Sequence, residues 1–205
     1  MVATPSLRAY YKEDTIEAGC DEAGRGCLAG PVVAAAVILP PGFSHPLLND
    51  SKQMSAKERL AVREVVMERA LAWGIALCTP QEIDRMNILR ASIVAMHRAL
   101  AKLPIEPELI LVDGNRFLPY ASIPHVCLVK GDSRFASIAA ASVLAKTERD
   151  ALMTNLHAEY PIYQWDKNMG YPTSAHRKLL TVYGASPCHR RTFRGVINGP
   201  ELPLP

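Results

Sequence analysis

The chain has 205 residues, of which 49% are hydrophobic and 21% are charged, the balance of a globular domain with a buried core. Its 23 basic and 20 acidic residues leave a formal net charge of +3, which permits a nucleic-acid partner without arguing for one. No apolar run approaches the ~20 residues of a membrane span, and the N-terminus lacks the apolar region of a signal peptide. We therefore expect a cytoplasmic protein with no membrane partner.

The first half of the chain predicts three strands and three helices after a polar arm over residues 1–14. The apolar segments with strand character cover residues 15–21, 31–39 and 73–78. The helical segments begin at Ser55, at Thr79 and near Ile88. Ser55 and Glu58 form a capping box, and Pro80 lies in the first turn after Thr79. The short glycine-rich turn between the first two strands indicates antiparallel pairing.

The second half of the chain alternates strands with helices. Short apolar strands are expected over residues 109–112 and 126–129, and helices over residues 135–157 and 175–183. Antiparallel strands followed by this alternation predict an α/β fold, with a mixed central β-sheet flanked by helices and a small C-terminal helical extension. The five scattered cysteines contain no CxxC pair, which favours a reducing compartment and argues against a zinc site or a disulfide framework.

Carboxylates stand at the ends of three predicted strands, namely Asp21 with Glu22, Asp113, and Asp132. Ligands of α/β sheets bind at such strand ends. Four carboxylates without histidine or cysteine suit hard cations, and two such ions ~3.5–4 Å apart can activate a water and stabilise the leaving oxygen in phosphodiester cleavage. Side chains alternate across a strand, so Asp21 and Glu22 serve one site only if the strand bends there or Glu22 already lies in the turn.

Two other interpretations of these segments remain open. The acids could be separate surface charges, although three strand-terminal acids in one small domain weigh against this. The segment GRGCLAG over residues 24–30 is similar to the dinucleotide-binding GxGxxG pattern. It has one residue too many and precedes a strand, so the helix N-terminus that holds a pyrophosphate is missing.

Five segments together resemble ribonuclease HII, the type 2 bacterial ribonuclease H. They are GCDEAGRGCLAGPVVAAAVIL, LNDSKQMS, LILVDGN, VKGDSRFASIAAASVLAKTERDALM and GYPTSAH, which occur in the family's order. The resemblance covers residues 16 to about 194. The resemblance implies a ribonuclease H-like fold and hydrolysis of the RNA strand of RNA–DNA hybrids by metal-activated water. It also implies incision 5′ of single ribonucleotides embedded in duplex DNA, leaving 5′-phosphate and 3′-hydroxyl ends.

The resemblance also assigns roles to individual residues. The metal-binding and catalytic acids of the family match Asp21, Glu22, Asp113 and Asp132, which would hold Mg²⁺ or Mn²⁺, two ions during catalysis. The family's readers of the 2′-hydroxyl, the group that distinguishes RNA from DNA, match Gly24, Arg25, Gly26 and Tyr171. As alternatives, Arg25 could pair with a metal-site carboxylate in the free protein, and Tyr171 could be a half-buried aromatic before a proline turn.

Phosphate contacts position a duplex without reading its sequence. The candidates for such contacts are Asn49, Ser51, Lys52, Ser133 and Lys146. A basic surface could be extended by Arg190, Arg191 and Arg194 with Phe193. His176 and His189 are expected to be structural or to lie on the phosphate side, and Asp150 is expected to form a structural ion pair with Arg149.

We expect one monomeric domain over residues 1–205, with nucleic acid as its partner. The catalytic core covers about residues 15–160, a substrate-contacting extension covers residues 161–197, and residues 198–205 form a disordered tail. A second hypothesis is a non-catalytic hybrid-binding protein, but that protein would lack one of the acids. A third is a small-molecule nucleotide-binding protein, which the absence of GxxxxGK[ST] opposes. The sequence does not choose between Mg²⁺ and Mn²⁺.

Overall fold

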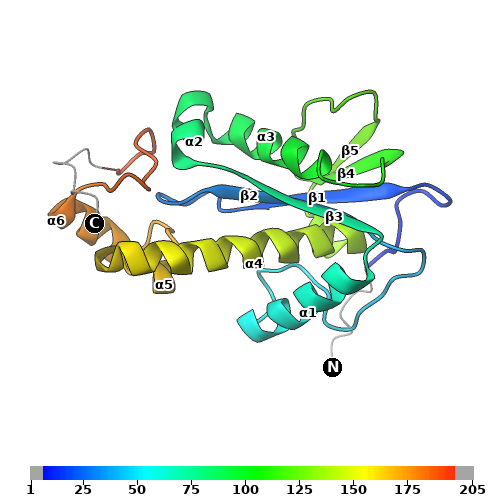
Figure 1. The fold of residues 1–205 in the computed structure, drawn as a ribbon, viewed down its shortest axis with the longest axis horizontal. Helices are drawn as coiled ribbons and strands as arrows, with labels where there is room; N and C mark the ends of the chain where they lie inside the picture. Colours follow the sequence, from blue (N-terminus) through cyan, green and yellow to red (C-terminus); the bar gives the residue numbers. More distant parts are fainter. Residues whose placement is uncertain (1–6, 197–205) are drawn as a thin grey trace.

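Figure 1 shows the computed structural model of the chain, which describes residues 7–196 as a five-stranded sheet with helices on both faces. The strands are β1 (Glu17–Ala23), β2 (Val32–Ile38), β3 (Ala72–Cys78), β4 (Leu109–Asp113) and β5 (His125–Leu128). They lie in the order β3-β2-β1-β4-β5, with β1–β2 and β2–β3 antiparallel and β1–β4 and β4–β5 parallel. The predicted α/β fold with a mixed sheet is confirmed.

The described residues form six α-helices, of which the first two begin directly after the predicted capping residues Ser55 and Thr79. They are α1 (Ala56–Arg69), α2 (Pro80–Met86), α3 (Ile88–Leu100), α4 (Ala136–Glu159), α5 (Trp165–Asn168) and α6 (Ser174–Tyr183), with 3₁₀ turns at Gly131–Ser133 and Pro161–Tyr163. The hydroxyls of Ser55 and Thr79 accept hydrogen bonds from the amides of Glu58 and Glu82, whose carboxylates accept from the cap amides in return. Each cap satisfies amides that the first helical turn leaves unpaired. Within the described residues, no helix has both the length and the apolar character needed to cross a membrane.

The sheet separates two helical layers. Helices α4 and α1 cover one face, and α2 and α3 cover the other (Figure 1). Ala18 and Cys20 of β1 belong to the core under α3. Gly19 between them faces α4, where an added Cβ atom would lie 2.2 Å from the carbonyl carbon of Ser137. Because only glycine permits this approach, the start of α4 lies directly against β1.

Strand β1 lies two residues further along the chain than the sequence predicts, since it begins at Glu17 and continues through Asp21 and Glu22 to Ala23 instead of ending at Asp21. The ladder with β2 explains the difference, because Asp21 pairs in register with Ala35 and Glu22 with Ala34. The acids interrupt the apolar pattern, so the pattern could not show that the strand runs through them.

The segment after α4 packs on the turn between β1 and β2. Its Tyr163 and Trp165 share a buried cluster with Leu28 and Ala29 of that turn. The sequence did not predict α5 or the 3₁₀ turns, because so few residues give no detectable period. The tail predicted over residues 198–205 lies outside the described residues.

Candidate metal centre

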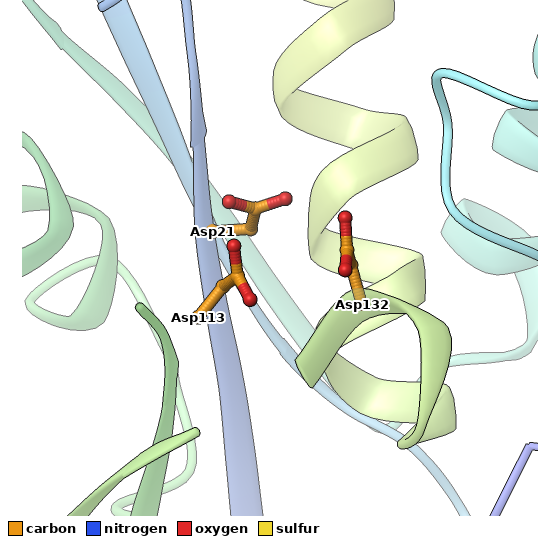
Figure 2. A group of neighbouring side chains, drawn as sticks. All are labelled: Asp21, Asp113 and Asp132. Atoms are coloured by element: carbon orange, nitrogen blue, oxygen red, sulfur yellow. The ribbon is translucent and has the colours of Figure 1, made fainter. Parts of the chain in front are cut away.

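Three aspartates from distant parts of the sequence meet at one edge of the sheet (Figure 2). Asp21 lies on β1, Asp113 is the last residue of the parallel neighbour β4, and Asp132 lies in the 3₁₀ turn before α4. One carboxylate oxygen of each aspartate lies within 4.8 Å of those of the other two. The carboxyl ends of parallel strands meet at the same edge of a sheet, which explains why these acids converge.

Backbone amides hold two of the three carboxylates in place. The amide of Gly131 donates to Asp113 Oδ1 at 2.7 Å, and the amide of Glu22 donates to Asp21 Oδ1 at 2.7 Å. The oxygens are thus oriented by groups that cannot change their charge.

Ser142 is a residue of this site that the sequence analysis missed. It lies on α4, is 3% exposed and hydrogen-bonds the carboxylate of Asp21. Its hydroxyl lies 2.8 Å from that of Ser51, so Ser51 donates to Ser142 when Ser142 donates to the aspartate. Nothing marks Ser142 within the run of small residues around it. Only the close packing of α4 on β1 identifies it.

Burial makes this aspartate cluster costly to ionise. Asp21 is 3% exposed and Asp132 is 4% exposed. Burial and the charges of Glu22 and Asp113 raise the pKa of Asp21 well above its usual range. Burial and the charge of Asp113 likewise raise the pKa of Asp132. A divalent cation relieves such repulsion, and a set of carboxylate oxygens suits a hard ion such as Mg²⁺ or Mn²⁺. The residues present therefore fit a hard divalent cation.

Glu22 is not one of the three converging carboxylates. It lines a second cavity of about 190 Å³ together with Leu89 of α3 and Asp113. Its carboxylate accepts a hydrogen bond from Arg25 Nη1 at 3.1 Å, which confirms the alternative interpretation of Arg25 as an ion-pair partner. Burial raises the pKa of Glu22 to about 7 against the opposing effect of Arg25, and the charge of Asp113 adds to the rise. Glu22 thus remains electrostatically coupled to the aspartates.

A cavity of about 220 Å³ lies at the cluster and collects most of the predicted site residues. Its lining contains Asp21, Glu22, Gly24, Arg25, Gly26, Ser51, Lys52, Asp113, Ser142, Lys146 and Tyr171. The turn after β1, the loop before α1, helix α4 and the loop before α6 therefore face one space.

The two predicted lysines of this cavity both contact acids. Lys52 Nζ lies 3.4 Å from Asp132 Oδ2, although the lysine side chain is 74% exposed. Lys146 Nζ donates to Asp150 Oδ1 at 2.7 Å. Each lysine supplies a positive charge beside the carboxylate cluster.

Two predicted phosphate contacts lie outside the cavity lining and make local hydrogen bonds. Asn49 Oδ1 accepts from the amide of Asp50 at 2.8 Å. The hydroxyl of Ser133 donates to the carbonyl of Lys130 at 2.9 Å, next to Asp132. Ser133 lies in the same 3₁₀ turn as Asp132, and Asn49 lies in the loop that contributes Ser51 and Lys52 to the cavity.

Two predictions about basic residues are wrong. Asp150 pairs with Lys146, not with Arg149. Arg190 is 0% exposed, so it does not extend a basic surface. Both arginines point inward, because buried backbone carbonyls there need donors. The sequence shows that an arginine is charged, but it does not show which backbone carbonyls lie within reach of its guanidinium group.

His176 and His189 are structural, one of the two roles predicted for them. Both are buried, and their Nε2 atoms lie 3.1 Å apart. His176 Nδ1 lies 2.9 Å from the Tyr171 carbonyl, so Nδ1 carries the proton and Nε2 accepts. Nε2 then accepts from His189 and from Trp165 Nε1 at 3.2 Å. Both imidazoles are therefore neutral and anchor the loop that carries Tyr171.

Comparisons with known proteins agree on one family. Residues 18–196 match the family model described as Ribonuclease HII. A relative named Ribonuclease HII, from Porphyromonas gingivalis (strain ATCC BAA-308 / W83), is 58% identical over 192 residues, which cover 94% of this chain and 96% of the relative. The crystal structure of the ribonuclease H2 from Pyrococcus horikoshii OT3 has a TM-score of 0.74 and 28% identity, covering 88% of this chain and 94% of that chain. The crystal structure of Bst-RNase HIII in complex with Mn²⁺ shares the fold, with a TM-score of 0.64 and 20% identity over 89% of this chain and 68% of that chain.

Proposed function

Since this chain belongs to the ribonuclease HII family, we propose that it incises duplex DNA on the 5′ side of a single embedded ribonucleotide. Family membership itself establishes the coarser activity, that of a metal-dependent endoribonuclease acting on RNA–DNA hybrids. The observation that carries the proposal is the group of three aspartate oxygens within 4.8 Å of one another. In the proposed reaction the products carry 5′-phosphate and 3′-hydroxyl ends.

In this proposal the acids are Asp21, Glu22, Asp113 and Asp132, and they bind two Mg²⁺ or Mn²⁺ ions. Divalent ions bound there supply an activated water nucleophile and offset the negative charge that develops on the phosphate and the leaving oxygen. The chain positions these acids: the amides of Gly131 and Glu22 orient the carboxylates of Asp113 and Asp21, and the Ser142 hydroxyl hydrogen-bonds the carboxylate of Asp21. No covalent intermediate is formed, so no serine or histidine nucleophile is needed.

The proposed readers of the ribose are the backbone of Gly24, Arg25 and Gly26 and the ring of Tyr171. Glycine leaves backbone N–H and C=O groups open to the 2′-hydroxyl, and an aromatic ring offers a flat apolar surface to the sugar. The shared cavity with the aspartates supports this assignment, because a reader must lie beside the scissile phosphate. Tyr171 is 39% exposed, so its ring is accessible to a substrate.

The proposed phosphate contacts are Asn49, Ser51, Lys52, Ser133 and Lys146. The segment over residues 161–197 contacts the substrate through Tyr171, and the enzyme works as a monomer. Lys52 is the contact best supported, since its side chain is 74% exposed and lies 3.4 Å from Asp132. A lysine in that position can leave the carboxylate for a phosphate without unpacking any core residue.

The test uses labelled duplexes that carry one ribonucleotide or none, incubated with Mg²⁺, with Mn²⁺ or with a chelator. Wild type is compared with Asp113→Asn and with Asp166→Asn, a matched change at an acid outside the site. We expect metal-dependent nicking of the ribonucleotide duplex by wild type and by Asp166→Asn, and binding without nicking by Asp113→Asn. Ligation and polymerase extension of the products identify the 5′-phosphate and 3′-hydroxyl ends.

Two results would contradict the proposal. If wild type binds the duplex and never cuts it with either metal, the protein is a hybrid-binding module. If wild type cuts the all-DNA control equally well, Gly24–Gly26 and Tyr171 do not read the ribose.

A further inference from the structure

Two arginines behind the proposed ribose readers are buried without an acidic partner. Arg149 of α4 and Arg190, which follows α6, are each 0% exposed. Among residues 7–196, neither forms a salt bridge with a carboxylate. Buried charges are normally paired, so the use of these guanidinium groups requires an explanation. Within the described part of the chain, every hydrogen bond that they donate goes to a backbone carbonyl.

Arg149 joins the turn after β1 to the loop that carries Tyr171. Its three nitrogens donate to the carbonyls of Pro31, Ala29 and Met169 at 3.1, 3.1 and 2.9 Å. Gly24 packs directly on this guanidinium with φ of +95°, and an added Cβ atom would lie 1.9 Å from Arg149 Nε. The arginine therefore fixes both the path of the turn and the need for glycine at its start.

Arg190 holds the proposed reader itself. Its Nη1 donates to the carbonyl of Arg25 at 2.9 Å, within the Gly24–Gly26 turn. Its Nε and Nη2 donate to the carbonyls of Gly30 and Pro31 at 3.0 and 3.1 Å. One rigid, planar group thus ties the middle of the turn to its end. The orientation of the Arg25 carbonyl fixes the plane of the peptide that continues to Gly26.

Tyr171 is held from several directions by the same cluster. Arg149 Cζ lies 5.8 Å from the centre of its ring, and so does Lys146 Nζ. Its hydroxyl hydrogen-bonds the buried Cys27 of the turn. Its carbonyl accepts from His176 Nδ1 at 2.9 Å. The ring and the turn are therefore parts of one rigid assembly.

We infer that Arg149 and Arg190 are positioning residues for ribose recognition: they set the Gly24–Gly26 backbone and the Tyr171 ring in place before substrate arrives. The inference rests on the proposed function, in which these groups read the 2′-hydroxyl. If the groups that contact the ribose are ordered before binding, no conformational entropy is lost in ordering them when substrate binds. Their selectivity therefore depends on the residues that hold them in place. The two arginines supply that order without touching the substrate.

The experiment measures selectivity with Arg190→Lys. Lysine keeps the charge but has a single nitrogen in place of the planar fork that reaches three carbonyls. Equilibrium affinities are measured in the presence of a chelator for three duplexes that differ at one sugar, which is ribose, 2′-fluoro or deoxyribose. We expect Arg190→Lys to lower the ratio of ribose to deoxyribose affinity about tenfold, the loss of one well-placed hydrogen bond. Affinity for the all-DNA duplex should stay within about twofold of wild type, because phosphate contacts dominate it.

The matched control is Arg63→Lys. Arg63 also bridges two elements, since it donates to Thr147 and Glu148 of α4 at 2.9 and 2.8 Å, but it makes no bond to the turn. Loss of hydrogen bonds between elements should lower the melting temperature of both variants. The ratio of ribose to deoxyribose affinity should nevertheless stay unchanged in Arg63→Lys. Should Arg190→Lys fail to fold, Arg149→Lys carries the same test from the other side of the turn.

The outcomes separate the inference from the function on which it rests. A wild-type protein without any preference for ribose overturns the proposed function. A wild-type preference that folded Arg190→Lys or Arg149→Lys retains within about twofold overturns the positioning role alone. An equal fall of the ratio in Arg63→Lys also overturns it, because the effect would then follow stability and not the turn.

Discussion

The aspartates at the sheet edge and the arginines behind the turn are both clusters of buried like charge, but the chain compensates them differently. Arg149 and Arg190 place their donors on backbone carbonyls, so the protein satisfies them by itself. Asp21 and Asp113 accept hydrogen bonds, yet within the described residues no basic side chain forms a salt bridge with either.

This difference corresponds to the two roles proposed for the site, which are metal binding and recognition of the sugar. A cluster whose charge the protein does not compensate needs an ion from solution. The repulsion among its carboxylates is relieved when that ion binds. A cluster that is satisfied internally needs nothing from solution and gives a rigid frame. In the proposed function, the catalytic half of the site therefore depends on metal, and the half proposed to recognise the sugar depends on packing.

The largest expected effect follows from removing a charge from the aspartate cluster. Asp21→Asn should lower kcat/KM about 10³-fold or more, because a group that stabilises the transition state is lost. The same change should raise the melting temperature of the metal-free protein by about 2–4 °C per kcal/mol of relieved repulsion. Cleavage assays and metal-free thermal unfolding measure the two effects. A variant that loses activity and also has a lower melting temperature without metal would contradict the contrast between the aspartate and arginine clusters.

The region around Arg149 and Arg190 should instead make the stability of the fold sensitive to acid, through His189. Burial and the neighbouring His176 lower the pKa of His189 from its ordinary value of 6.5 to about 3. Between these values the unfolded state binds a proton that the folded state does not, so stability falls as the pH drops below 6.5. The slope approaches about 1.4 kcal/mol per pH unit.

Urea unfolding of metal-free wild type and His189→Asn between about pH 7 and pH 4 measures this slope. The difference between the two proteins isolates His189 from the acids, whose raised pKa values act in the opposite direction. The account predicts a shallower loss of stability in the variant. Parallel curves would show that His189 is protonated as readily in the folded state as in the unfolded state.

A smaller effect is expected at Ser142, which supports the aspartate cluster from α4. Ser142→Ala removes the hydrogen bond to Asp21 and leaves the Ser51 hydroxyl without that partner. Loss of such a supporting bond typically costs 10–100-fold in metal affinity or activity. The apparent affinity for Mn²⁺ in cleavage assays should fall by about that factor. Unchanged Mn²⁺ dependence would mean that the backbone amide alone orients Asp21.

The smallest effect is expected at Lys52, whose side chain is 74% exposed. Lys52→Ala should weaken duplex binding only a few-fold and equally for ribose and deoxyribose duplexes. The slope of log affinity against log salt should become less steep by about 0.9, the value for one phosphate contact on duplex DNA. Lys57→Ala, at an exposed lysine on α1, is the matched control. An unchanged salt slope in Lys52→Ala would remove Lys52 from the phosphate contacts.

The sequence predicts the aspartate cluster better than the arginine cluster. Asp113 ends β4, Asp132 follows β5 and Asp21 lies near the end of β1, so strand topology alone brings them together. The arginine cluster depends on which side chain reaches which carbonyl across residues far apart in the chain. No periodicity shows that pairing, so the sequence alone predicts an ion pair for Arg149 and a surface position for Arg190.

The measurement that tests the central claim most directly is uptake of Mn²⁺, followed by the electron paramagnetic resonance signal of the free ion. Wild type, Asp113→Asn and Arg190→Lys are titrated up to millimolar Mn²⁺ without nucleic acid, because a duplex binds the ion itself and wild type would cut it. The account predicts uptake by wild type and by Arg190→Lys, and at least about tenfold weaker uptake by Asp113→Asn. Equal uptake by wild type and Asp113→Asn would contradict the claim that the aspartate cluster is the part of the site that needs an ion.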